Sequence, residues 1–321
     1  MRYFLGVDVG GTKTHAMLAD EDCRVAGFGE AGPGNHEGVG YAGLEAAMEE
    51  AVAGALAQAG TGIRSIAGAG FGVGGYDWPS EYEPTMRSIG TLGIQAPVEL
   101  VNDAMLGLVA GAKAGWGVAV VGGTGCNCWG WDAAHRIGHV TGAGSWMGEG
   151  AGASELVQEA VGRVSRFWSL RGPRTRLVEA FIEYTGSSSL EDLIEGLVMQ
   201  RYPLDHRAAP LVFQVAETGD TAACEVITWA GEALGDLAVG VIRQLELGAL
   251  EFEVILVGSL YSGGQLLIEP MERVIHRAAP RAKLVRLEAP PVVGGVLLGM
   301  KQAGLEMAGR REALVANFLP K

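Results

Sequence analysis

Two short glycine-rich segments combine the residue types that bind phosphate. The first is Asp8-Val9-Gly10-Gly11-Thr12-Lys13-Thr14, and the second is Gly122-Gly123-Thr124-Gly125-Cys126-Asn127. Glycines let phosphate oxygens approach the backbone N–H groups of a turn, and threonine adds a hydroxyl donor. One such segment alone is more simply explained as a hairpin turn, but two equivalent segments favour a clamp on both ends of a polyphosphate. The predicted phosphate-binding residues are Gly10, Gly11, Thr12, Lys13, Gly123, Thr124 and Gly125.

Two aspartates are placed to do chemistry beside these segments. Asp8 closes the first apolar stretch, where a carboxylate can hold a magnesium ion directly or through water. Asp103 follows the apolar stretch 98–101, at the carboxyl end of an expected strand, where ligands gather in α/β folds. A carboxylate there can accept a proton from a substrate hydroxyl. Alternatively, Asp103 is the N-cap of the helix that follows.

Two other glycine-rich segments are weaker candidates for a ligand site. Gly258–Gly264 lies between an apolar strand and a helix, so it is either a seat for adenosine or phosphate, or a plain loop. Gly70–Gly75 fits the pattern G-x-G-x-x-G, but residues 76–79 do not open a helix, so we expect no dinucleotide site. The chain contains no G-x-x-x-x-G-K-[ST] phosphate loop.

A third pattern offers metal-ligating residue types. Cys126, Cys128, His135 and His139 lie close together in the sequence, which invites a zinc interpretation. The single residue between the cysteines is a tighter spacing than zinc sites use, and all four residues cross one predicted hairpin. Buried cysteines and surface histidines are the simpler interpretation, and the zinc alternative stays open.

The expected elements of the first half place these residues at loop ends. Strands are predicted at 3–9, 13–20, 24–29, 65–72 and 98–101. A helix is predicted at 41–59, since Leu44, Met48, Val52 and Leu56 recur on one face and Gly60 ends it. Gly10 and Gly11 are expected to form a two-residue hairpin turn at positive φ. The predicted order is β-β-β-α-β-α-β-α.

The same order then begins again in the second half of the chain. Strands are predicted at 116–121, 126–131, 136–140, 252–257 and 283–286. Helices are predicted at 149–167, 173–184, 189–199, 206–217, 221–246 and 264–278, and a long helix or a pair of helices at 293–317. This duplication predicts an α/β fold of two domains that face each other across a cleft and move as hinged bodies. We expect residues 1–105 with 297–321 in the first domain and 106–296 in the second.

Composition limits the class of protein. The 321 residues include 51 glycines and are 48% hydrophobic and 19% charged, which excludes a disordered chain. The net charge is −13 and no basic stripe occurs, so we expect neither a nucleic-acid nor a membrane partner. The four cysteines do not form a disulfide framework, and neither a signal-peptide core nor an apolar run of 18 residues occurs. A cytoplasmic protein is expected.

Three segments carry a resemblance to a known family: Gly6–Thr14, Val101–Ala104 and Gly123–Cys128. The chain resembles the N-acetylglucosamine kinase family, which is grouped with the BadF/BadG/BcrA/BcrD-type ATPases. This group belongs to the acetate-and-sugar-kinase, heat-shock-chaperone and actin superfamily. The resemblance extends from the first hairpin to Gly294-Gly295. It implies two ribonuclease-H-like domains closing on ATP, Mg²⁺ and an amino sugar, transfer of the γ-phosphate to the sugar 6-hydroxyl, and a homodimer.

The resemblance also assigns roles to individual residues. Thr12 and Thr124 would contact phosphates, Asp8 would organise the metal, and Asp103 would be the catalytic base that binds the 6-hydroxyl. The sugar-binding residues would be Asn35, His36, Asp103, Cys126, Asn127, Gly142, Gly144 and Glu149. The adenosine pocket would include Ala216, Gly258 and Ser262.

The chain departs from the family pattern on the sugar side of the second half. Ala143 stands where the family has tryptophan, Cys126 stands in place of serine, and the segment 148–152 is Gly-Glu-Gly-Ala-Gly instead of Gly-Asp-Glu-Gly-Ser. We expect Glu149 to extend its carboxylate about one methylene further into the pocket, which would reject N-acetylglucosamine or select another sugar. Glucosamine, N-acetylmuramic acid and glucose are the alternative acceptors.

Two other functional classes stay open. An activator-type ATPase that drives electron transfer would need cysteines at a domain or dimer junction for an iron–sulfur cluster. Cys126 and Cys128 instead lie in and beside the second phosphate segment, while Cys23 and Cys224 are far apart in sequence. A non-catalytic sensor is disfavoured because both Asp8 and Asp103 are present.

Overall fold

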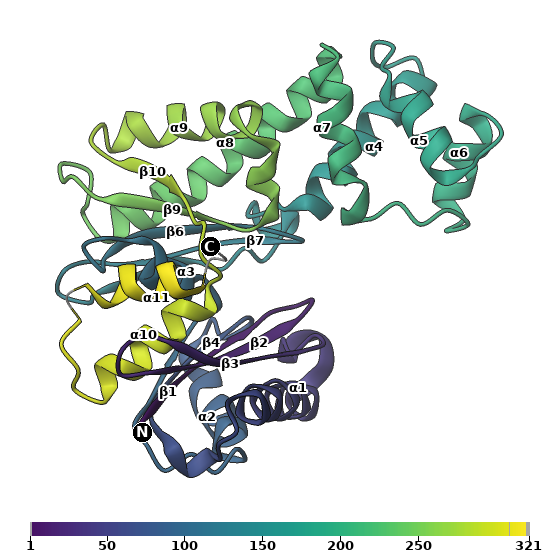
Figure 1. Cartoon of the computed structure of the whole chain (residues 1–321). Helices are drawn as coiled ribbons and strands as arrows, with labels where there is room; N and C mark the ends of the chain where they lie inside the picture. Colours follow the sequence, from purple (N-terminus) through teal and green to yellow (C-terminus); the bar gives the residue numbers. More distant parts are fainter. Residues whose placement is uncertain (1, 308, 319–321) are drawn as a thin grey trace. The chain divides into compact units, whose positions relative to one another are not determined.

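The chain folds into two α/β units. The computed structural model describes residues 2–307 and 309–318. The first unit comprises Met1–Ala119, Trp129–His135 and Val285–Lys321, and the second comprises Val120–Cys128 and Arg136–Leu284. The chain therefore passes between the units four times. Figure 1 shows the elements along the chain.

A five-stranded sheet forms the centre of the first unit, in the order β3-β2-β1-β4-β5. The strands are β1 (Tyr3–Val9), β2 (Thr14–Asp20), β3 (Val25–Ala31), β4 (Ile66–Val73) and β5 (Val98–Val101). Strands β1, β2 and β3 pair antiparallel, whereas β4 pairs parallel with both β1 and β5. The carboxyl ends of β1, β4 and β5 consequently share one edge of the sheet.

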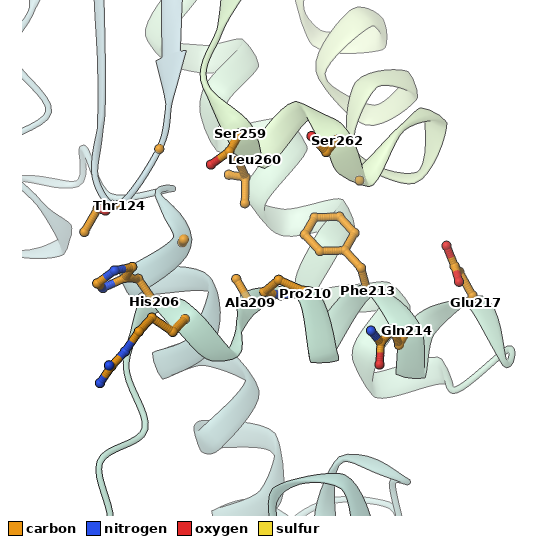
Figure 2. A pocket seen from close by; sticks show the side chains of 14 residues that line it. Thr124, His206, Ala209, Pro210, Phe213, Gln214, Glu217, Ser259, Leu260 and Ser262 are labelled. Carbon is orange, nitrogen blue, oxygen red and sulfur yellow. The ribbon is translucent and has the colours of Figure 1, made fainter. Parts of the chain in front are cut away.

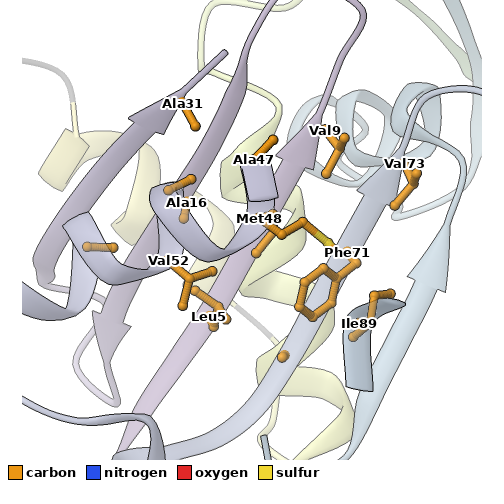
Figure 3. Packing of buried hydrophobic residues seen from close by; sticks show 14 of the residues in the cluster. Leu5, Val9, Ala16, Ala31, Ala47, Met48, Val52, Phe71, Val73 and Ile89 are labelled. Carbon is orange, nitrogen blue, oxygen red and sulfur yellow. The ribbon is translucent and has the colours of Figure 1, made fainter. Parts of the chain in front are cut away.

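Alternating side chains of these strands enter two separate cores. Leu5 and Phe71 pack with α1 (His36–Ala59), and Figure 3 shows Met48 of this helix beside Phe71. Phe4 and Met17 enter the other core with α10 (Val292–Gln302). The remaining helices of this unit are α2 (Tyr82–Gly90), α3 (Asp103–Gly111) and α11 (Arg310–Phe318), with short 3₁₀ helices η1 (Ile63–Ser65) and η2 (Pro79–Glu81).

Glycines bring α10 into backbone contact with the sheet. A Cβ atom on Gly6 would lie 2.4 Å from the carbonyl oxygen of Val292, and one on Gly70 would lie 2.3 Å from that of Gly295. Real Cβ atoms do not approach other atoms so closely. These positions therefore exclude any side chain, because the helix and the strands occupy the space.

Another five-stranded sheet has the order β10-β9-β6-β7-β8. Its strands are β6 (Gly117–Gly122), β7 (Cys126–Trp131), β8 (Ile137–Val140), β9 (Glu253–Val257) and β10 (Lys283–Arg286). When β6 is matched to β1, the two sheets have the same strand order. The predicted duplication within an α/β fold is confirmed.

Helices make up most of the second unit. They are α4 (Ala153–Trp168), α5 (Leu177–Thr185), α6 (Leu190–Val198), α7 (Ala209–Glu217), α8 (Thr221–Gln244) and α9 (Gln265–Ala278). Short 3₁₀ helices occur at η3 (Ser145–Met147), η4 (His206–Ala208) and η5 (Ser259–Gly263). Helix α8 packs against α7, α9 and β8. Among the described residues, no helix combines the length and apolar character that crossing a membrane requires.

The predicted turn geometry at the first glycine segment is wrong. Strand β1 ends at Val9 and β2 begins at Thr14, so the loop has four residues and is closed by a 3.0 Å bond from the N–H of Gly10 to the carbonyl of Lys13. Neither Gly10 nor Gly11 adopts positive φ. The glycines are therefore not required by the backbone conformation.

The predicted helix starts at residues 41 and 149 also differ from the structure, whereas the alternative of a C-terminal pair of helices agrees with it. Helix α1 begins at His36, five residues early, with a kink at Gly40, whose φ is 69°. Helix α4 begins at Ala153 instead of 149, since the residues before it form a loop. The C-terminal segment forms a pair of helices, α10 and α11.

Candidate functional site

Asp8 and Asp103 lie at the shared carboxyl edge of β1, β4 and β5. Burial is the main reason that the pKa of Asp8 rises from 3.8 to about 7. The charge of Asp103 raises this pKa as well, and the Lys13 ammonium lowers it. The structure thus brings three predicted site residues of the first unit within electrostatic reach of one another.

Asn102, not Asp103, is the N-cap of α3. Its Oδ1 accepts a 3.0 Å bond from the N–H of Ala104, and its Nδ2 donates to Asp77 Oδ1 at 3.0 Å. Asp103 is the first helical residue, and its Oδ1 also accepts from the N–H of Ala104, at 2.9 Å. The interpretation of Asp103 as the N-cap is wrong. The sequence analysis missed the buried Asn102, which fixes the start of α3.

Gly74 lies beside the second oxygen of Asp103. A Cβ atom on Gly74 would lie 3.2 Å from Asp103 Oδ2 and 3.1 Å from the carbonyl of Val9. The N–H of Gly74 donates to that carbonyl at 2.8 Å, which holds the loop after β4 against the end of β1. A side chain at position 74 would therefore cover the Asp103 carboxylate.

The first glycine loop is tied to the predicted sugar-binding segment. The carbonyl of Gly10 accepts hydrogen bonds from the N–H groups of Gly34 and Asn35, at 3.0 and 3.2 Å. Thr12 and Lys13 are exposed at the tip of the loop. Backbone hydrogen bonds therefore join the loop that we predict to bind polyphosphate to the segment that we predict to bind sugar.

Asn35 and His36 open helix α1. Asn35 Oδ1 accepts a 2.9 Å bond from the N–H of Glu37 and caps the helix. His36 stacks on Tyr41 at 4.6 Å, and its Nε2 lies 3.4 Å from Glu81 Oε1. The other ring nitrogen, Nδ1, is buried and has no hydrogen-bond partner in the described part of the chain. A buried ring nitrogen without a partner is expected to find one in a ligand or in water.

The second glycine loop rests on the start of helix α4. The N–H groups of Ala153 and Ser154 donate to the carbonyls of Gly123 and Thr124, at 2.9 and 3.0 Å. A Cβ atom on Gly152 would lie 2.5 Å from the Cα of Gly125, so the two backbones touch. Thr124 and Gly125 remain exposed. The loop is thus anchored from beneath while its tip faces solvent.

A cavity of about 530 Å³ adjoins this loop. Gly123, Thr124 and Ser262, which were all predicted to bind nucleotide, line it. Figure 2 shows Thr124 and His206 at one end, Glu217 at the other and the Phe213 ring between them. The volume is within the range of small-molecule sites.

The other predicted adenosine residues lie behind the cavity wall. Ala216 is buried on α7, while its helix neighbours Phe213 and Glu217 line the cavity. Gly258 has a φ of 112°, and a Cβ atom there would lie 2.3 Å from the carbonyl of Gly122. Gly258 therefore lets the β9 loop approach the end of β6.

The segment that departs from the family pattern forms a closed loop. Glu149 Oε2 accepts hydrogen bonds from the N–H groups of Gly142 (2.9 Å) and Ala143 (3.1 Å) and from Thr141 Oγ1 (3.1 Å). The Cys126 thiol donates to the Glu149 carbonyl at 3.1 Å. We expected the Glu149 carboxylate to extend further into the pocket. In the structure it turns back onto its own loop and bonds residues 141–143.

Burial makes Cys126 a weak acid. Burial is the main cause that raises the pKa of the Cys126 thiol to about 11. The N–H of Ala151 donates to the sulfur at 3.1 Å and lowers this pKa. Burial also raises the pKa of Cys128, which is fully covered on β7. Within residues 2–307 and 309–318, no three His, Cys, Asp or Glu side chains gather as a metal site would require.

Glu155 is a candidate that the sequence analysis missed. It lies in the first turn of α4, and its Oε2 is buried without a hydrogen-bond partner among the described residues. A Cβ atom on Gly150 would lie 2.8 Å from Glu155 Cγ, so the glycine makes room for this side chain. The signal in the sequence is the acidic residue placed just after three alternating glycines, at 148, 150 and 152.

Comparison with known proteins identifies the family of the chain. The model of the BadF/BadG/BcrA/BcrD ATPase family matches residues 5–299. The chain belongs to this family. The resemblance inferred from the glycine segments is therefore confirmed.

Relatives of this ATPase family member carry kinase names. The chain is 21% identical to an N-acetylmuramic acid/N-acetylglucosamine kinase of Clostridium acetobutylicum, over 94% of this chain and 99% of that one. It is 24% identical to an N-acetyl-D-glucosamine kinase of Dictyostelium discoideum, over 92% and 97%. The structure of a Chromobacterium violaceum protein assigned as an N-acetylglucosamine kinase has a TM-score of 0.65 at 22% identity, covering 93% of this chain and 99% of that one. The shared fold extends over nearly the whole chain.

Proposed function

We propose that the protein is an ATP-dependent kinase that transfers the γ-phosphate of ATP to the 6-hydroxyl of an amino sugar, namely N-acetylglucosamine. The observation that carries the proposal is the duplication. Each unit ends its first strand in a Gly-Gly-Thr loop, and the first unit adds Asp103 at the same edge as its loop. Membership of an ATPase family and relatives named as amino-sugar kinases support the same activity.

Asp103 is the proposed general base. Asn102 caps α3 and holds the start of the helix, and a Cβ atom on Gly74 would lie 3.2 Å from Asp103 Oδ2. In this proposal the carboxylate hydrogen-bonds the 6-hydroxyl, orients its oxygen towards the γ-phosphorus and accepts the proton as the new O–P bond forms. Most of the rate then comes from positioning and charge neutralisation.

ATP is proposed to be held by both glycine loops. Thr12 and Lys13 of the first loop and Thr124 of the second would contact its phosphates, because their exposed tips offer N–H, hydroxyl and ammonium donors. The cavity beside Thr124 fits the adenosine, with Phe213 as an apolar wall and Ser262 as a polar edge. Ala216 and Gly258 would shape this pocket from behind.

Asp8 fits a magnesium ion bound together with the phosphates. The pKa of Asp8 is raised by burial and by the neighbouring Asp103 carboxylate. A nearby cation would stabilise the charged form of Asp8 and lower this pKa. Magnesium commonly binds through one or two carboxylates and substrate phosphates, so a cluster of three protein ligands is not needed. When bound, the ion would neutralise phosphate charge during transfer.

The sugar is proposed to bind at the residues that the resemblance assigns to it. Asn35 and His36 belong to the first unit, whereas Cys126, Asn127, Gly142, Gly144 and Glu149 belong to the second. The unpartnered Nδ1 of His36 is suited to a sugar hydroxyl. We further propose a homodimer in the cytoplasm, with no nucleic-acid or membrane partner.

The activator-type ATPase is the less supported alternative. Cys126 and Cys128 are buried on β7, and the Cys126 sulfur is hydrogen-bonded to the loop that follows. Cysteines that ligate an exposed shared cluster would need to present their sulfur atoms outward. The arrangement of these side chains favours the kinase.

A coupled assay of ATP turnover tests the proposal. The acceptors are N-acetylglucosamine, glucosamine, N-acetylmuramic acid and glucose, each with Mg²⁺, against a control without sugar. N-acetylglucosamine should raise ADP release well above the background, and Asp103→Asn should lower kcat by at least about a hundredfold while sparing ATP binding. The exposed Asp22, which pairs with Arg24, supplies the matched control Asp22→Asn. If no sugar raises turnover, or if Asp103→Asn stays active, the kinase or its base is assigned wrongly.

A further inference from the structure

Glu81 joins two segments of the first unit through one carboxylate. Its Oε2 accepts hydrogen bonds from the N–H groups of Asp77 and Trp78, at 2.8 and 2.9 Å. Its Oε1 lies 3.4 Å from Nε2 of His36, at the start of α1. Glu81 was not among the predicted site residues, yet its carboxylate faces one of them. Its contacts therefore connect the loop after β4 to the predicted sugar-binding segment.

Backbone contacts hold the Glu81 carboxylate in place. Glu81 is the last residue of η2, and Pro79 is the first, a residue whose ring fixes φ at a helical value. The N–H of Glu81 donates to the carbonyl of Trp78 at 3.0 Å, so its main chain and its side chain bind the same short segment. Hydrogen bonds from N–H groups to a carboxylate are charge-assisted and stronger than those between neutral groups. Two of them on Oε2 consequently fix the direction of Oε1.

A glycine at positive φ brings this loop against the start of α1. Gly75 has a φ of 83°, and a Cβ atom there would lie 2.5 Å from Asn35 Oδ1 and 3.1 Å from Glu37 Cγ. A side chain at position 75 would therefore push the loop away from the N-cap of the helix. Because of this close approach, Glu81 reaches the first turn of α1, where His36 lies.

The His36 ring is fixed, and its two nitrogen atoms have different surroundings. The ring stacks on Tyr41, with 4.6 Å between the centres and 19° between the planes. The His36 side chain is 9% exposed. Nε2 faces the Glu81 carboxylate, whereas Nδ1 is buried and has no hydrogen-bond partner within residues 2–307 and 309–318. A buried polar atom without a partner costs free energy unless a ligand or water supplies one.

The carboxylate decides which nitrogen of a neutral His36 ring carries the proton. A neutral imidazole has one N–H and one lone pair, and an ionised carboxylate can only accept a hydrogen bond. A proton on Nε2 would meet the negative Oε1, but a proton on Nδ1 would leave the Nε2 lone pair against that oxygen. The environment therefore favours the proton on Nε2 and leaves Nδ1 as an acceptor.

We propose that Glu81 is a positioning residue, which keeps the His36 proton on Nε2 so that Nδ1 accepts a hydrogen bond from a sugar hydroxyl. The identity of this ligand rests on the proposed function, whereas the tautomer of His36 does not. The ligand must offer a donor to Nδ1, so a hydroxyl fits and an ether oxygen or a fluorine in its place does not. Glu81 acts through His36 and is not itself proposed to contact the sugar.

Nuclear magnetic resonance of the whole protein without ligand tests the tautomer. Histidine labelled with ¹⁵N gives separate signals for the two ring nitrogens, and the variant His36→Gln identifies the signals of this ring among the six histidines. The wild type should show a protonated Nε2 and an unprotonated Nδ1 at pH 8. In Glu81→Gln the amide nitrogen can donate to Nε2, so the population with the proton on Nδ1 should rise. The amide oxygen still accepts from Asp77 and Trp78, so the thermal midpoint should stay close to that of the wild type.

Titration with N-acetylglucosamine and steady-state kinetics test the consequence for the ligand. The sugar should shift the Nδ1 signal of His36 more than the Nε2 signal, because the new hydrogen bond forms at Nδ1. In Glu81→Gln the KM for the sugar should rise at least about tenfold and the KM for ATP should stay within about twofold, since only the sugar loses its acceptor. Glu83→Gln removes the same charge from an exposed position of α2 and should change neither the tautomer nor either KM.

The outcomes separate the role of Glu81 from the proposed kinase function. The proposal is overturned if wild-type His36 carries a proton on Nδ1, or if Glu81→Gln leaves both the tautomer and the sugar KM unchanged. An equal rise of both KM values with an unchanged tautomer would also overturn it and leave Glu81 a structural role only. If the tautomer responds to Glu81→Gln but no sugar shifts Nδ1 or raises ATP turnover, the proposed kinase function is wrong, while the control of the His36 ring by Glu81 is supported.

Discussion

Glu149 Oε2 accepts a 2.9 Å hydrogen bond from the backbone N–H of Gly142, seven residues earlier in the chain. The same oxygen accepts bonds from Ala143 and Thr141, so one carboxylate closes the whole loop. Gly142 has a φ of 71°, and a Cβ atom there would lie 1.5 Å from the carbonyl of Cys126. The loop therefore lies directly on β7, and its shape depends on Glu149.

Replacing Glu149 should release this loop. Glu149→Ala removes an acceptor shared by three donors, which should cost about 1–3 kcal/mol and speed hydrogen exchange at the amides of Gly142 and Ala143. Glu149→Asp should give a similar result, because the carboxylate recedes by one methylene. In the proposed kinase, the KM for sugar should rise more than the KM for ATP. Glu269→Ala, on helix α9, is the control; unchanged exchange at Gly142 in Glu149→Ala would contradict the assigned role.

The stability of the protein without ligands should depend on Asp8. Its pKa is about 7 when folded and 3.8 in the reference state, so the folded chain binds more protons between these values. Stability should consequently fall as the pH rises from about 4 to 7, by up to about 4 kcal/mol from this group. Asp8→Asn should raise the thermal midpoint at pH 8 and have little effect at pH 4. Equal shifts at both pH values would exclude this titration as the cause.

The Cys126 thiol should be unreactive in the folded protein. Its pKa of about 11 keeps it protonated at pH 8, and the side chain is buried. Since the thiolate is the nucleophile, iodoacetamide should modify Cys126 only after denaturation, whereas the less buried Cys224 should react earlier. Mass spectrometry of partly alkylated protein measures the order. Rapid labelling of Cys126 would mean that the loop opens in solution.

Two glycine-to-alanine variants should have opposite effects. Gly70→Ala would place a Cβ atom 2.3 Å from the carbonyl of Gly295, so it should destabilise the first unit by about 1–3 kcal/mol or prevent folding. Gly162→Ala, on α4, meets no atom within 4 Å and should stabilise by about 0.5–1 kcal/mol. Urea unfolding measures both changes. If Gly70→Ala is neutral, the strand and α10 are not in backbone contact.

Local patterns in the sequence were sufficient to predict the helices and strands and their duplication. Strands such as 98–101 and 126–131 are found where they were predicted, because alternating or continuous apolar runs are written in neighbouring residues. The cavity wall was less predictable. Phe213 lies on α7, which precedes α8 in the chain, and Ser262 lies in η5, which follows it. No short-range sequence pattern relates either residue to Thr124.

The sequence by itself determined that this chain has two copies of one α/β unit, each with a Gly-Gly-Thr loop after its first strand. It did not determine what each glycine does. Gly10 and Gly11 were expected to provide positive φ, yet they lack it, while Gly6 and Gly70 admit α10 against the sheet. Residues 6 and 295 meet only after helix α10 packs back on β1, and steric exclusion between distant segments has no local signature. Tertiary packing alone decided which glycines lie against a helix.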